Sequence, residues 1–168
     1  MPVTSHLLRP VRPSLIILTL ICALLFNLLP WQLIGNHFAP DFVALMLLYW
    51  TLNQPRRVGV GWAFVLGVCM DVADGNLLGQ HALAYSVITY LVLSRQRQLN
   101  IFPYWQQATA VLGLMVFAQL LMAAVRLIAG ADLPAISYFL GPLLTAFLWV
   151  PVSNLLLAYQ RKPVSESL

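Results

Sequence analysis

The stretch "GVCMDVADGNLLG", residues 67–79, carries the feature that decides the fold of this chain. It begins as an apolar run and then places Asp71 and Asp74 three residues apart, just before Gly75. A glycine suits the position just past a helix end, because it adopts a left-handed backbone conformation without steric penalty. The stretch therefore predicts that one helix ends here and that another begins a few residues later, which makes a tight helical hairpin.

The composition indicates an integral membrane protein. Of the 168 residues, 61% are hydrophobic and only 8% are charged, and the mean hydropathy is +0.83. Soluble domains carry about a quarter of their residues as charged side chains, so lipid must be the solvent for most of this chain. The net charge of +4 does not indicate nucleic-acid binding, because the nine basic residues are scattered between apolar runs and form no stripe.

The apolar runs predict an all-α membrane protein with six transmembrane helices in a single domain, residues 1–168. Each crossing of a bilayer takes about twenty mostly apolar residues. The first run lacks the small-residue pattern of a cleaved signal peptide, so it is expected to remain as a span. The predicted spans are approximately residues 14–34, 42–54, 58–73, 77–94, 101–128 and 136–159.

The distribution of charge predicts the orientation of these spans. With the N-terminus in the cytoplasm, eight of the nine basic residues fall on the cytoplasmic side, as the positive-inside rule requires. The exception is Arg126, near the outer end of the fifth span. The chain is therefore expected to keep both of its ends in the cytoplasm. The cytoplasmic connections between spans carry Arg56, Arg57, Arg95 and Arg97, and the outer side carries Asp41, Asp71, Asp74 and Asp132.

The two aspartates of the opening stretch are expected to play different parts. They are three residues apart and so share one face of the helix. Asp74, at the helix end, is expected to be chiefly a turn or cap residue. Asp71 lies one turn deeper, where a carboxyl group must face a partner, a cavity or another protein. A proton or cation relay, a ligand site and a hydrogen-bonded packing contact all remain open for Asp71.

Arg126 is the obvious intramolecular partner for an aspartate on the outer side. An Asp71–Arg126 or an Asp132–Arg126 pair would explain why this arginine breaks the charge rule. If Asp71 and Arg126 form the pair, the double alanine variant should lose less stability than the sum of the two single variants.

The sequence shows no motif for a cofactor, a metal or hydrolytic catalysis. Asp71, Asp74 and His81 lack any recognised ligand spacing across the glycine turn, and neither "GxSxG" nor "HExxH" occurs. Small residues do recur in the third span: Gly59, Ala63 and Gly67 are spaced by four, and Gly61 lies beside them. Such rows allow helix backbones to approach closely in membranes.

Several of these residues together resemble the MreD family of rod shape-determining proteins. The resemblance rests on "PD" at 40–41, Pro55, the pair Arg56–Arg57 and "VGVGWAFVLGVCMDVADGNLLGQHAL" at 58–83. It is dense over residues 38–93, and "YWQQA" at 104–108 looks like the proteobacterial branch. Trp62 is a mild departure from the family pattern. Asp74 also departs from it, so of the two aspartates Asp71 is the better match to the family position. The family positions present here are Pro55, Gly61, Gly67, Asp71, Gly75, Leu78, Gly79, Ala82 and Leu83.

The resemblance implies a non-enzymatic scaffold without a cofactor, in the inner membrane of rod-shaped bacteria. MreD-like proteins support lateral-wall peptidoglycan synthesis in the elongation complex. The implied partners are MreC and, directly or through it, the RodA glycosyltransferase, its class B penicillin-binding transpeptidase, MreB and RodZ. The implied fold is similar to the substrate-binding components of energy-coupling-factor vitamin transporters. Docking of small-residue helix faces against the single membrane helix of MreC is the physical route that we expect.

Two other classes of function remain open from the residues alone. A transporter, a vitamin-binding component or a lipid-handling protein would need convergent polar groups around a cavity. The outer half offers Asn27, Asp71, Asp74, His81, Arg126 and Asp132 for this purpose. A membrane-embedded enzyme is the third class, and the chain has few ionisable groups with which to build one. A small molecule retained by the purified protein would favour transport, whereas co-purification with MreC would favour the scaffold.

Overall fold

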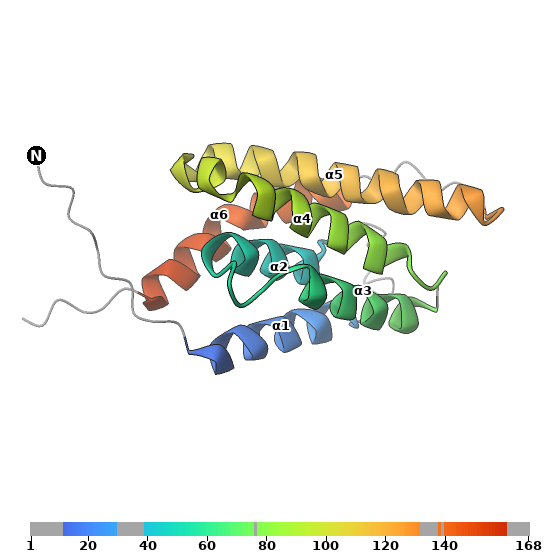
Figure 1. Ribbon diagram of the computed structural model, residues 1–168, viewed down its shortest axis with the longest axis horizontal. Coiled ribbons are helices and arrows are strands. Elements are labelled where there is room, and N and C mark those ends of the chain that lie inside the picture. Colours follow the sequence, from blue (N-terminus) through green and yellow to red (C-terminus); the bar gives the residue numbers. More distant parts are fainter. Residues whose placement is uncertain (1–11, 30–38, 76, 132–137, 139, 161–168) are drawn as a thin grey trace, which may run out of the picture.

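The computed structural model describes residues 12–29, 39–75, 77–131, 138 and 140–160, and the described chain is all-helical. Consecutive helices run in opposite directions along one bundle (Figure 1). Each helix lies within or close to one of the six predicted spans. The helices are α1 (Pro13–Asn27), α2 (Phe42–Asn53), α3 (Val60–Asp74), α4 (Gln80–Ile101), α5 (Tyr104–Ile128) and α6 (Leu140–Gln160).

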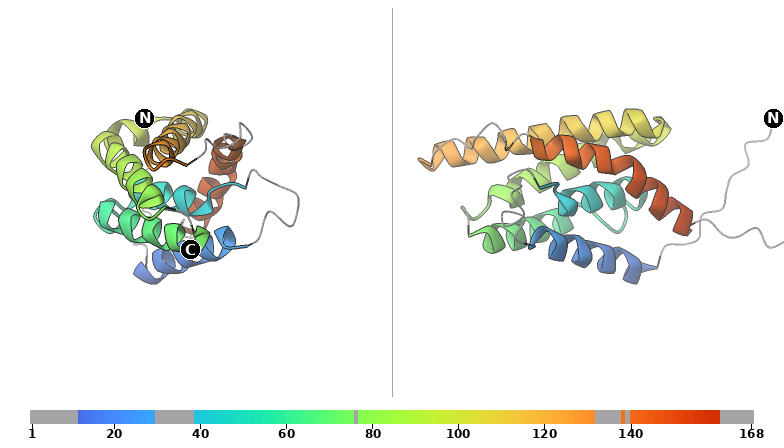
Figure 2. Two further views of the ribbon diagram at one scale, coloured as in Figure 1. Left: turned by 90° about the vertical axis from the view of Figure 1, so that its right-hand side faces the viewer. Right: turned by 180° about the vertical axis from the view of Figure 1, so that it is seen from behind.

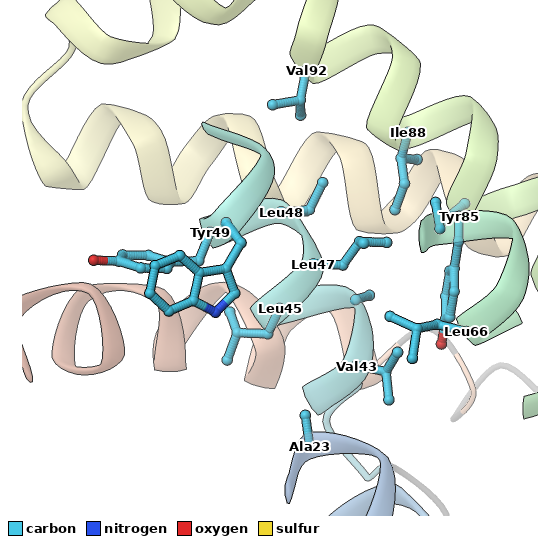
Figure 3. Close-up of a cluster of buried hydrophobic side chains, with 14 of the residues drawn as sticks. Ala23, Val43, Leu45, Leu47, Leu48, Tyr49, Leu66, Tyr85, Ile88 and Val92 are labelled. Atoms are coloured by element: carbon cyan, nitrogen blue, oxygen red, sulfur yellow. The ribbon is translucent and has the colours of Figure 1, made fainter. Parts of the chain in front are cut away.

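The α2 helix forms the centre of the bundle. It packs against α1, α3, α4 and α6, and all its residues from Val43 to Leu52 are buried except Met46. Its side chains meet those of the surrounding helices in one apolar cluster (Figure 3). A helix that is apolar on every side is suited to such a position. Its 12 residues span only about 18 Å, which is less than the hydrocarbon thickness of about 30 Å.

The outside of the bundle is also apolar. Large side chains such as Leu18, Phe147 and Leu155 are 58%, 78% and 70% exposed, as expected of surfaces that face lipid. Among the described helices, α5 and α6 are long and apolar enough to cross a membrane, whereas α1 and α2 are apolar but shorter. The arrangement agrees with a membrane protein, and the number of six crossings stays a prediction.

The two ends of the bundle carry opposite charge. One end, here called the basic end, holds the start of α1, the finish of α6 and the links from α2 to α3 and from α4 to α5 (Figures 1 and 2). The opposite end, here called the acidic end, holds the α3–α4 turn and the starts of α2 and α6. The described basic end carries Arg12, Arg56, Arg57, Arg95 and Arg97, and the acidic end carries Asp41, Asp71 and Asp74 together with one arginine, Arg126, in the last turn of α5. This separation of charge between the two ends is the one that the charge pattern predicted.

The α4 helix continues beyond the predicted end of its span. It runs to Ile101, so Arg95 and Arg97 lie on its last turns and not in a connecting loop. Arginine and glutamine are good helix formers, and the helix stops just before Pro103, which disfavours helical backbone at the residue before it. The amide of Gln96 donates to the carbonyl of Leu52 at 2.9 Å, which ties this extension to the end of α2.

The α3–α4 hairpin is the most extensive helix pair in the bundle. A methyl group placed on Gly67 would lie 2.4 Å from the Cα atom of Ala82, so the two backbones are in direct contact there. Ala63 is fully buried one turn earlier. Gly59 precedes α3, and Gly61 on α3 is exposed with no neighbour within 4 Å. The row of small residues therefore serves close packing at Gly67 and Ala63 and not at Gly59.

Replacing Gly67 by alanine should destabilise the protein by about 1–3 kcal/mol, because the added methyl group forces the α3 and α4 backbones apart. Gly61→Ala is the matched control, since its methyl group meets open space and alanine is the better helix former. Thermal unfolding of the two purified variants in detergent measures the difference. Equal unfolding temperatures would contradict the close contact.

Candidate functional site

Asp71 lies at the centre of the acidic end and joins α3 to the start of α4. Its side chain is buried. One carboxylate oxygen accepts hydrogen bonds from the backbone N–H of His81 at 2.8 Å and from the His81 ring at 2.9 Å. The other accepts from the N–H groups of Gly79 at 2.8 Å and Ala82 at 3.3 Å. Asp71 therefore caps the N-terminus of a helix other than its own.

The local sequence explains why α4 needs this cap. The first N–H groups of a helix have no partner within the helix, and a side chain at the N-cap position usually satisfies one of them. Here the N-cap is Gly79, which has no side chain and has φ of +99°. A carboxylate from the neighbouring helix supplies the acceptors instead, and its negative charge also complements the positive end of the α4 dipole. These contacts offset the cost of burying the charge of Asp71.

His81 lies between the two aspartates of α3. Its Nδ1 atom contacts Asp71, and its Nε2 atom is 3.7 Å from a carboxylate oxygen of Asp74. Its ring packs edge-on against Tyr85 with 5.7 Å between centroids. The two carboxylates approach different nitrogens of one ring, so they do not converge on a common point. The described residues accordingly hold no group of three side chains placed to bind a metal ion.

Asp41 forms a second, partly buried cap at the same end of the bundle. It precedes α2 and accepts the backbone N–H of Ala44 at 2.9 Å. The same carboxylate accepts the side-chain amide of Asn27 at 3.0 Å and the Tyr85 hydroxyl at 2.6 Å. The backbone N–H of Asp41 donates to the hydroxyl of Thr145 at 3.0 Å. One residue thus connects α1, α2, α4 and α6.

Asp41 is the residue whose importance the sequence analysis missed. It entered there only as an outer aspartate and as half of the "PD" pair. A stronger signal was available, because an aspartate placed directly before a long apolar helix is a typical N-cap. Its contact with Tyr85, one turn after His81 on α4, extends the capping network from Asp71 to α1 and α6.

Arg126 does not pair with Asp71. Its Nε atom donates to the side-chain oxygen of Gln80 at 3.0 Å, and its guanidinium carbon lies 5.7 Å from the centre of the Tyr138 ring. Within the described part of the chain, no ion pair joins Arg126 to Asp71. The reason is that both carboxylate oxygens of Asp71 already accept N–H groups of α4. Asp132, the other expected partner, lies outside the described residues.

The remaining turn residues show how the hairpin closes. Gly75 follows the last residue of α3 with φ of +62°, the left-handed conformation expected of it. Asp74 is that last residue, and its side chain is 37% exposed. Leu78 is 73% exposed and so does not pack into the core. Gly79 contributes its backbone, since it donates to Asp71 from a conformation that favours glycine.

Comparison with known proteins identifies the family. The family model described as rod shape-determining protein MreD matches residues 9–158. The chain belongs to the MreD family. A relative from Haemophilus influenzae, named rod shape-determining protein MreD, is 30% identical over 142 residues, which cover 84% of this chain and 88% of the relative. No solved structure matches the chain, so the expected likeness to energy-coupling-factor components is untested.

The MreD-like stretch at 58–83 is also the part of the chain that builds the cap of α4. It supplies the buried acceptor at Asp71, the close helix contact at Gly67 and the turn at Gly75 and Gly79. Gly67, Asp71, Gly75 and Gly79, which belong to the stretch that carried the resemblance, thus have a common structural role. They hold α3 and α4 together at the acidic end.

Removing the Asp71 carboxylate should destabilise the protein strongly. Asp71→Ala leaves several N–H donors without an acceptor, and because each unsatisfied buried donor costs about 1–3 kcal/mol, a total loss of about 3 kcal/mol or more is expected. In a double-mutant cycle measured by unfolding in detergent, Asp71→Ala should couple with His81→Ala. A larger coupling energy between Asp71→Ala and Arg126→Ala than between Asp71→Ala and His81→Ala would support the Asp71–Arg126 pair that the sequence suggested.

The contact between Tyr85 and Asp41 can be tested by removing one oxygen atom. Tyr85→Phe should lower the free energy of unfolding by about 1–3 kcal/mol, because the carboxylate of Asp41 then loses the hydrogen bond that the buried Tyr85 hydroxyl donates. Tyr90→Phe is the matched control on the same helix, since Tyr90 is 63% exposed. Urea or thermal unfolding in detergent compares the two, and an equal effect of both variants would count against the Asp41 network.

Proposed function

We propose that this chain is a non-enzymatic scaffold of the machinery that builds the lateral cell wall in rod-shaped bacteria. Its membership of the MreD family of rod shape-determining proteins is the observation that carries this proposal. In it, the chain crosses the inner membrane six times and keeps both ends in the cytoplasm. The separation of arginines and aspartates between the two ends of the bundle supports that orientation.

The use of the two capping carboxylates supports a scaffold more than an enzyme. Asp41 and Asp71 each engage both carboxylate oxygens with donors of the chain itself. A general base or nucleophile must instead present a free atom to the substrate. These two carboxylates stabilise the bundle, so its outer faces are the surfaces that remain for binding partners.

The proposed direct partner is MreC, which the chain would meet through helix docking within the membrane. The α3 helix offers one face for this contact, because Gly61, Val65 and Val72 are exposed along it at helical spacing. Lipid gives no hydrophobic gain for association, so the fit of small and branched side chains has to supply the attraction. RodA, the class B transpeptidase, MreB and RodZ would join directly or through MreC.

Depletion of the protein in its rod-shaped host should turn the cells spherical, because lateral-wall synthesis would lose its scaffold. Re-expression of the chain should restore the rods, and cell shape scored by phase-contrast microscopy measures both effects. Cells that stay rod-shaped after depletion would contradict the proposed role. A small molecule retained by the purified protein, with no effect on shape, would favour transport instead.

The docking face can be tested separately from the role in shape. Gly61→Leu should weaken co-purification with MreC several-fold by adding bulk on the exposed face of α3, where nothing of the chain itself lies within 4 Å. Gly113→Leu on α5 is the matched control, since Gly113 is also exposed with no neighbour within 4 Å. Equal co-purification of both variants would remove α3 as the docking face and would leave the scaffold role intact.

A further inference from the structure

A hollow of about 360 Å³ opens at the acidic end, between the α3–α4 turn and the last turn of α5. It is lined by Gly75, Leu77, Gln80, Arg126 and Ala131. None of these residues takes part in the caps of Asp71 or Asp41 through its side chain. The hollow is therefore a feature separate from the capping network, although it lies beside it.

The polar groups that line this hollow are hydrogen-bond donors. The bond from Arg126 to Gln80 uses only the Nε atom of the guanidinium, which carries two further NH₂ groups. That bond and the ring of Tyr138 hold the arginine in place. Gln80 is almost fully buried, and its side-chain NH₂ group has no acceptor. An unsatisfied buried donor is unfavourable, so a ligand that offers oxygen atoms would improve this site.

The charge of the site comes from Arg126. The positive end of the α4 dipole is already balanced by Asp71, whose carboxylate accepts the first N–H groups of that helix. Guanidinium groups bind phosphate oxygens with two parallel hydrogen bonds, a geometry that an ammonium group cannot reproduce. Asp74 lies near enough to Arg126 for their charges to interact. Removing the Asp74 carboxylate should therefore strengthen the binding of an anion at this site and weaken the binding of a cation.

The surroundings of the hollow are apolar and exposed. Leu77 in its wall is 39% exposed, and Leu78 beside it is 73% exposed. Along α5, Leu127 and Ile128 follow Arg126 directly and are 53% and 87% exposed. A soluble phosphate compound has no hydrocarbon chains to place against these exposed apolar side chains. A ligand with a phosphate next to hydrocarbon chains satisfies both the donors and the rim.

We propose that this hollow binds the phosphate group of a phospholipid, with Arg126 as the principal ligand and the Gln80 amide as a second donor. The acyl chains would then lie over the apolar residues of the rim. The site is independent of the role in cell shape and of the docking face on α3. It would fix one lipid at the acidic end of the bundle, where the α3–α4 hairpin meets α5.

Native mass spectrometry of the full-length protein in detergent tests this site with phosphatidylglycerol as the probe. The wild type should retain the lipid, and diacylglycerol with the same acyl chains should be retained at least tenfold less. Arg126→Gln should reduce retention roughly tenfold or more, since it removes a charge-assisted contact. The retention of phosphatidylglycerol by Arg126→Lys should lie between that of the wild type and that of Arg126→Gln. Arg95→Gln, which removes an exposed arginine of the basic end, is the matched control and should retain the lipid fully.

Gln80→Glu is the sharpest variant, because it keeps an acceptor for Arg126 and so preserves the fold. It replaces the free NH₂ donor by a negative charge, and it should abolish retention of phosphatidylglycerol without lowering the unfolding temperature. Asp74→Asn should raise retention, because it removes a negative charge near Arg126, and a fall in retention would contradict an anionic ligand. These two variants separate loss of the ligand from loss of the folded protein.

Four results would overturn the proposal. Retention of diacylglycerol equal to that of phosphatidylglycerol would show that apolar contacts alone bind the lipid and that the phosphate is not recognised. Stabilisation by inorganic phosphate through Arg126, without retention of phosphatidylglycerol, would assign the site to a free anion. Full retention by Gln80→Glu would place the lipid elsewhere. Loss of MreC binding in Arg126→Gln, with lipid retention unchanged, would assign the hollow to a protein partner.

Discussion

The structure depends on how helix starts are satisfied inside a membrane. Lipid offers no hydrogen bonds, so the first N–H groups of a helix that begins within it need acceptors from the protein. Asp71 provides them for α4, and Asp41 accepts one of the first N–H groups of α2, that of Ala44. In each case a carboxylate that would be costly alone is stabilised by several donors, and it fixes how neighbouring helices meet. A chain with only five acidic residues uses two of them in this way.

The two caps also determine what the rest of the bundle can do. Through Tyr85, Asn27 and Thr145, the Asp41 cap connects α1, α4 and α6 around the central α2 helix. The Asp71 cap holds α3 against α4, where Gly67 allows the backbones to touch. Because these polar groups are engaged within the bundle, other molecules can bind only at its outer faces and at the hollow beside Arg126. This division suits a protein that works by binding neighbours in the membrane.

Much of the fold could be predicted from local patterns. The apolar runs located the helices because helix length and hydrophobicity are properties of a contiguous segment. The family of the chain also followed from a contiguous stretch, since Gly67, Asp71, Gly75 and Gly79 lie within one hairpin. The α4 boundary was missed because hydropathy ends a span at the first charges, whereas the helix itself continues through Arg95 and Arg97 until Pro103.

The residues alone predict a membrane protein, the approximate positions of its helices and the need of a carboxylate at position 71 for a partner. The identity of that partner follows only from how the helices pack. Charge alone suggested Arg126. In the structure, N–H groups at the start of α4 occupy both carboxylate oxygens of Asp71, because the glycine turn folds the next helix back over it. The capping of α2 by Asp41 could have been predicted, but its contacts with Asn27, Tyr85 and Thr145 could not, since these residues are distant in sequence and meet it only when the helices pack.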